Sequence, residues 1–99
     1  METNYYTVQY NKSQYNEKDW KEYLSVFLEN GEPVIEELKP FRGKVPDEIL
    51  IPIGRIIGAA SALWLNKELT EIPGYTPLSL LQSEDGTKAL KAVIMRLYC

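Results

Sequence analysis

The sequence contains no histidine and only one cysteine, Cys99, which is its last residue. Histidine is the commonest general base, the usual activator of a serine or cysteine nucleophile and the commonest metal ligand, so its absence argues against an enzyme and against a metal site. A single cysteine excludes an internal disulfide, and chains with few cysteines are typical of reducing compartments. We therefore expect a cytoplasmic protein without catalytic residues or a bound metal.

The sequence also lacks a phosphate-binding loop, a membrane or signal segment, and an excess of positive charge, and each absence argues against one class of function. The glycine segment 54–58 lacks the lysine and the preceding strand of a phosphate-binding loop, so no nucleotide cofactor is expected. The most apolar stretch, residues 49–65, contains Pro52 and Arg55 and is shorter than the roughly 20 residues of a membrane span, and the N-terminus has no basic-then-apolar signal pattern. A net charge of -3 opposes attraction to phosphates. We expect neither membrane association nor direct binding to nucleic acid.

Paired carboxylates are the remaining candidates for chemistry. Adjacent residues on a helix point about 100° apart and do not face each other, so a charge at the start of a helix is the favoured role. The pairs are Glu36-Glu37, Asp47-Glu48 and Glu84-Asp85. The sequence therefore predicts a protein that is not an enzyme.

The chain has 99 residues, 44% apolar and 25% charged, which fits one folded domain over residues 1–99. Residues 5–10 are rich in aromatic and β-branched side chains and predict a short extended segment. An amphipathic helix follows, capped by Asn16 and ended by Asn30-Gly31. Its apolar face consists of Trp20, Tyr23, Leu24, Phe27 and Leu28.

The second half of the chain is predicted to be helical. Prolines and glycines make residues 32–46 mostly loop, between an N-terminal strand-and-helix part, 1–45, and a helical part, 46–99. Residues 46–65 predict a long central helix, on which Gly54, Gly58 and Ala62 form a ridge that favours a close helix contact or a homodimer. Arg55 is expected on its exposed edge. We predict a mainly α fold, a compact bundle of about four helices with a short N-terminal extended segment.

Two helix starts follow in close succession. Thr76 and Pro77 predict an N-cap and a first helical residue, and Ser83 before two carboxylates repeats the signal. The last helix is expected to leave Lys88 and Lys91 in water. Its buried stripe is predicted to comprise Leu90, Val93, Ile94 and Leu97. A helical-hairpin core accounts for all of these residues.

The same residues, taken together, resemble the toxin-binding domain of Xre/MbcA/ParS-type antitoxins over residues 64–98. That domain carries a Trp-Leu pair, a Gly-Gly-x-Thr-Pro-Leu-x-Leu-Leu segment, an acidic step ending in glycine, and a closing Gly-Arg-Ile. Pro73 and Met95 replace two of its glycines here. The matching positions, which the resemblance makes the scaffold of the motif, are Trp64, Gly74, Thr76, Pro77, Leu80, Leu81 and Gly86.

The resemblance implies an antitoxin that neutralises a partner toxin by covering its active site. In related systems the toxin commonly has a RES-type domain that consumes NAD. The residues that would face the toxin are Tyr75, Arg96, Leu97 and Tyr98.

A small acidic inhibitor or adaptor is the main alternative. It would be a phage-encoded anti-defence protein that binds a nucleic-acid-processing complex of the host. Acidity and aromatic residues favour this hypothesis, because five of the seven tyrosines lie in the first 23 residues and aromatics are enriched at protein interfaces.

Overall fold

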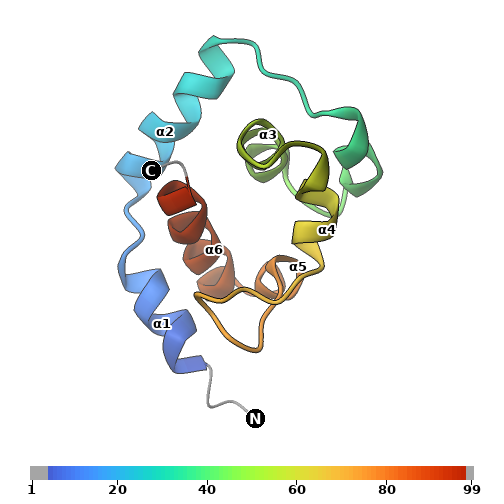
Figure 1. Cartoon of the computed structure of the whole chain (residues 1–99). Coiled ribbons are helices and arrows are strands. Elements are labelled where there is room, and N and C mark those ends of the chain that lie inside the picture. Colours follow the sequence, from blue (N-terminus) through green and yellow to red (C-terminus); the bar gives the residue numbers. More distant parts are fainter. Residues whose placement is uncertain (1–4, 98–99) are drawn as a thin grey trace.

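The computed structural model describes residues 5–97, and these residues are mainly helical, as expected (Figure 1). The α-helices are α1 (Tyr5–Ser13), α2 (Glu17–Glu29), α3 (Asp47–Ile56), α4 (Ser61–Leu65), α5 (Pro77–Leu80) and α6 (Glu84–Leu97). Two 3-10 segments, η2 (Glu36–Phe41) and η3 (Gly58–Ala60), flank α3, and no β-strand occurs in the described range. Since α4 and α5 are only about one turn long, the expected bundle of about four helices is not confirmed.

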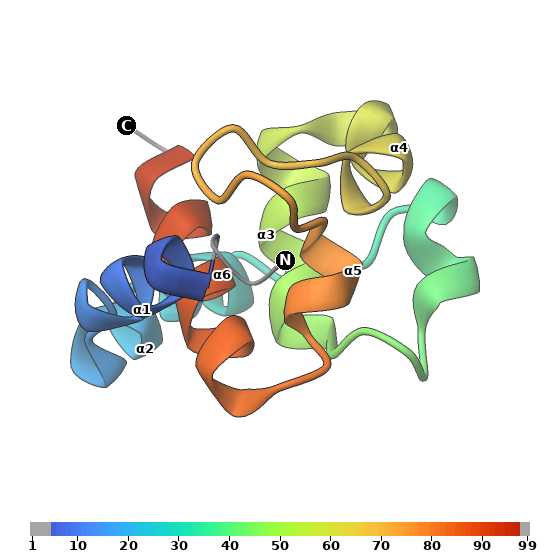
Figure 2. The same ribbon diagram turned by 90° about the horizontal axis from the view of Figure 1, so that it is seen from below.

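Helix α6 lies at the centre of the fold, where it contacts α1, α2, α3 and α5 (Figures 1 and 2). Its start is the predicted one: the Ser83 hydroxyl accepts the Gly86 N–H at 2.9 Å, and two carboxylates occupy the first turn. Leu90 and Ile94 are fully buried on its inner face. The predicted central helix, residues 46–65, is therefore not the central element.

The N-terminal segment is a helix, so the predicted extended segment at residues 5–10 is wrong. Its aromatic and β-branched residues favour strands, and a helix of nine residues has little stability of its own. Contact with α6 overrides that preference. Val8 is buried. Gln9 donates a hydrogen bond to the Asp85 carboxylate of α6 at 2.9 Å, and Lys12 forms an ion pair with the same carboxylate at 3.2 Å. Tertiary packing thus determines the conformation of α1.

Helix α2 is confirmed with its predicted cap. The Asn16 side chain accepts a backbone N–H of the first turn at 3.0 Å, and the helix stops before Asn30-Gly31, where Gly31 has a φ of 69°. Trp20 and Phe27 are buried on the predicted face. Leu28, expected on the same face, is 55% exposed.

The predicted long helix over residues 46–65 is interrupted. The chain turns at Gly58, whose φ of 81° is a left-handed conformation, and continues through η3 into α4. The three small residues therefore do not share one helix and do not form the ridge on which a homodimer was expected. Gly54 does allow a close approach, because a Cβ there would lie 3.2 Å from the Ile35 side chain.

Two other expectations concern the segments around α3. Residues 36–41 form the 3-10 helix η2 instead of loop, because Leu38 is drawn into the core and is fully buried. Arg55 is exposed, as expected, and pairs with Glu32 at 3.4 Å.

None of the helices in the described part of the chain has the length and apolar character needed to cross a bilayer.

Lys91 is not in water, contrary to the prediction. Its side chain is only 13% exposed, and its Nζ lies 3.1 Å from a carboxylate oxygen of Glu48 and 5.3 Å from the centre of the Trp20 ring. The Trp20 indole N–H donates to the same carboxylate at 3.2 Å. Nearby, burial and then the charges of Glu17 and Glu48 raise the pKa of Tyr15. This cluster joins α2, α3 and α6.

Replacement of Lys91 by alanine should lower the free energy of unfolding by roughly 1–2 kcal/mol. The reason is that Glu48 and the Trp20 ring lose their common cation, while the partial exposure of Glu48 keeps the loss below that of a fully buried pair. Urea denaturation followed by tryptophan fluorescence measures the change. Lys88→Ala is the matched control, because Lys88 pairs only with Glu84, whose side chain is 84% exposed. Equal effects of the two substitutions would contradict the role given to Lys91.

Candidate functional site

The residues of the antitoxin-like pattern form one continuous structural unit. It consists of α4, the loop 66–76, α5 and α6, and the loop reaches across toward α6 in Figure 2. Thr76 and Ser79 cap α5 reciprocally: the Ser79 N–H donates to Thr76 Oγ1 at 3.1 Å and the Thr76 N–H donates to Ser79 Oγ at 2.9 Å. Leu65 and Leu80 are buried, and Trp64 packs against the core. The pattern therefore describes a folded scaffold.

At two positions of the pattern, Gly74 and Gly86, the structure requires glycine. A Cβ on Gly86 would lie 2.1 Å from the backbone oxygen of Leu80, so only glycine permits the close approach of α5 to α6. Gly74 has a φ of 91°, and its N–H donates to the Glu68 carboxylate at 2.7 Å. The half-buried Leu81 completes the scaffold set.

Of the four residues predicted to face a toxin, the three that the structure describes do not form one cluster. Tyr75 is half-buried and packs against the core, where its backbone oxygen accepts the Leu69 N–H at 2.9 Å. Arg96 is exposed beside α1, whereas Leu97 lines a different pocket beside α2. Tyr98 lies outside the described residues. Only Arg96 stands in a setting that itself indicates a ligand.

That setting is a groove between α1, the loop before α5 and the end of α6, which we name the Arg96 groove. Its volume is about 500 Å³. Tyr6 and Tyr10 are 79% and 61% exposed, one turn apart on α1. The groove is lined by Tyr6, Thr7, Tyr10, Asn11, Gln14, Glu71 and Arg96. Tyrosine and arginine are the residues most often found where binding energy is concentrated in protein interfaces.

A buried asparagine holds the guanidinium of Arg96. Asn11 is only 2% exposed, and its Nδ2 donates to the Thr7 carbonyl at 2.8 Å. Its Oδ1 is thereby left to accept a hydrogen bond from Arg96. One of the five guanidinium donors is used in this way. The other donors remain available at the surface.

The charge of Arg96 is not balanced by a carboxylate in the described part of the chain. Arg42 pairs with Asp47 at 2.8 Å and Arg55 pairs with Glu32, whereas the partner of Arg96 is the neutral amide of Asn11. The hydrogen bond and charge of Asp47 also raise the pKa of Arg42. Arg96 is thus the arginine whose charge an external anion can neutralise.

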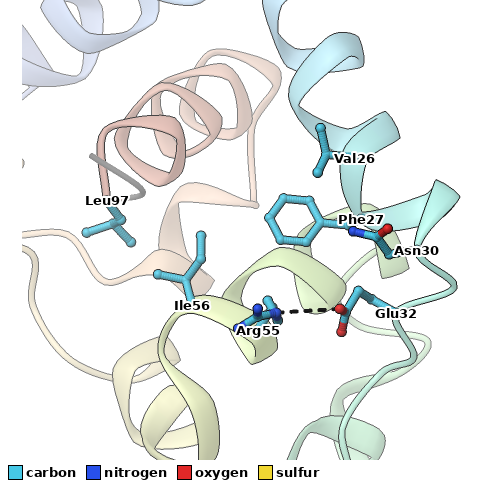
Figure 3. A pocket seen from close by; sticks show the side chains of 7 residues that line it. All are labelled: Val26, Phe27, Asn30, Glu32, Arg55, Ile56 and Leu97. Atoms are coloured by element: carbon cyan, nitrogen blue, oxygen red, sulfur yellow. Dashed lines mark ion pairs between the residues drawn. The ribbon is translucent and has the colours of Figure 1, made fainter.

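A second pocket, which we name the Phe27 pocket, lies between α2, α3 and the end of α6 (Figure 3). Its volume is about 280 Å³. Figure 3 shows Leu97 across the pocket from Phe27, with Ile56 between them. The Arg55–Glu32 pair lies below Phe27 in this view. The arginine at this pocket is already paired, so its charge does not select an anion.

Sequence reasoning missed Asn11 and Glu71 as parts of a site. The predicted extended segment covers residues 5–10 and does not include Asn11, so the sequence interpretation does not relate Asn11 to Val8. On the helix they are three residues apart and share the buried face. That spacing was the available signal.

Comparison of the chain with models of protein families, with curated proteins and with solved structures finds no match. Within residues 5–97, no three histidine, cysteine, aspartate or glutamate side chains are grouped as a metal ion would require. The function must therefore be inferred from the residues themselves.

Replacement of Gly86 by alanine should destabilise the fold by roughly 1–3 kcal/mol, although alanine is the better helix former. The added methyl group would collide with the Leu80 backbone and force α5 away from α6. Thermal denaturation followed by circular dichroism measures the loss. Glu84→Gln, a change at an exposed position of the same helix turn, serves as the control and should alter stability by less than about 0.5 kcal/mol. A more stable Gly86→Ala variant would contradict the close approach.

Proposed function

We propose that this chain is a non-catalytic protein-binding domain that acts as an antitoxin, covering the active site of a partner toxin. The observation that carries the proposal is the Arg96 groove, to which the antitoxin-like unit contributes Arg96 and Glu71 and the N-terminal part contributes the other lining residues. Exposed tyrosines and an arginine without a carboxylate partner give this surface the composition of a protein-binding site. The resemblance of residues 64–98 gives the class of partner, a toxin of the RES type.

The absence of histidine supports the same proposal, because the chain lacks the commonest general acid and base of enzymes. The single cysteine supports a cytoplasmic location. Trp64 packs on the core, Thr76 caps α5, and Gly86 allows α5 to approach α6, so these residues act as scaffold. The residues that contact the toxin would then lie on the surface beside them.

Co-expression with a RES-type toxin encoded next to this chain should restore growth and yield a complex that survives size-exclusion chromatography. Arg96→Gln should weaken the complex about tenfold or more, since an interface arginine at the centre of a contact contributes 2 kcal/mol or more. Arg42→Gln is the matched control, because Arg42 is also exposed but is paired with Asp47 away from the groove. Loss of growth rescue by the unaltered chain, together with absence of a complex, would refute the antitoxin function.

An acidic inhibitor of a host nucleic-acid-processing complex is the second candidate, favoured by the net charge of -3. Affinity purification from the native cells separates the two. Recovery of a small NAD-consuming toxin supports the antitoxin, whereas recovery of a nuclease complex supports the inhibitor.

A further inference from the structure

The Arg96 groove combines a fixed cation, two exposed aromatic side chains and one opposing charge. Because Asn11 is buried and its amide is oriented by Thr7, the guanidinium that it holds is positioned before any ligand arrives. Arg96 also lies in the last turn of α6, where the negative end of the helix dipole stabilises a cation. These features describe a prepared site for an anion.

The charge on the opposite side of the groove limits which anion fits. Glu71 lines the groove but forms no ion pair with Arg96, and its carboxylate accepts only a hydrogen bond from Thr70 among the described contacts. A phosphate or a polyanion would be repelled by Glu71 and by the net charge of the chain. A single carboxylate suits the guanidinium donors that Asn11 does not use, with which it can form two parallel hydrogen bonds.

The exposed tyrosines indicate what surrounds that carboxylate. Tyr6 and Tyr10 offer apolar ring surface on the same groove, and such surface favours contact with apolar side chains of a partner. We propose that the Arg96 groove binds an aspartate or glutamate side chain of the partner protein, in a segment where apolar residues flank the acidic one. Arg96 binds the carboxylate, and Asn11 is its positioning residue.

This inference rests on the proposed function for the class of partner, but its test requires no toxin. The probes are two peptides with blocked ends, acetyl-Leu-Glu-Leu-amide and acetyl-Leu-Gln-Leu-amide, which differ only in the charge of the central side chain. Each is titrated into the uniformly ¹⁵N-labelled full chain. The amide signals of α1 and α6 and the arginine Nε–Hε signals report binding.

The glutamate peptide should bind about tenfold more tightly than the glutamine peptide, with the largest shifts at Arg96 and in α1. Arg96→Gln should reduce the affinity for the glutamate peptide to that of the glutamine peptide. Arg42→Gln should leave both affinities unchanged. Equal binding of the two peptides, absence of binding by both at millimolar concentration, or shifts confined to other surfaces would overturn the proposal.

Two further variants distinguish the positioning of Arg96 by Asn11 from the effect of the net charge in the groove. Asn11→Asp places a carboxylate against Arg96 and should abolish the preference for glutamate, whereas Glu71→Gln removes the opposing charge and should strengthen binding of the glutamate peptide about twofold to threefold. Neither variant should change the affinity for the glutamine peptide. A preference for glutamate that is unaltered in Asn11→Asp would refute the positioning role.

The outcomes of this titration and of the co-expression experiment are distinguishable. A chain that prefers the glutamate peptide but does not rescue growth would retain the carboxylate site and exclude the antitoxin function. Rescue of growth by a chain that binds the two peptides equally would retain the antitoxin function and exclude the carboxylate site.

Discussion

Burial of α6 is the constraint on which the rest of the fold depends. Its apolar face is covered by helices from both halves of the chain, with α1 and α2 on one side and α3 and α5 on the other. Polar contacts fix these neighbours: Asp85 holds α1, and Lys91 joins α2 and α3 through Trp20 and Glu48. Without α6, helix α1 would lose the helix on which it packs, and α5 would lose its main neighbour.

Features set by neighbouring residues could be predicted from the sequence, whereas features set by distant contacts could not. The caps at Asn16, Thr76 and Ser83 were correct because a cap is a bond within one helical turn. The helical state of α1 was missed because α6 imposes it, and the burial of Lys91 was missed because its partners lie on two other helices.

The same distinction applies to the candidate site. The pattern over residues 64–98 singled out Arg96, but its guanidinium is held by Asn11 of the first helix, 85 positions away in the chain. No local pattern links those two residues. The N-terminal part is therefore more than a support for the antitoxin-like unit, since it supplies the side chain that fixes the arginine and the tyrosines that flank it.

The position of α6 in the chain also affects how the protein is made. Residues 84–97 leave the ribosome after the helices that pack on them, so α1 cannot make its contacts with α6 until they emerge. At roughly 5–20 residues per second, the first helix waits several seconds before α6 can cover Val8. During that interval the apolar face of α1 is open to non-native contacts, and it gains its native neighbour only when α6 has emerged.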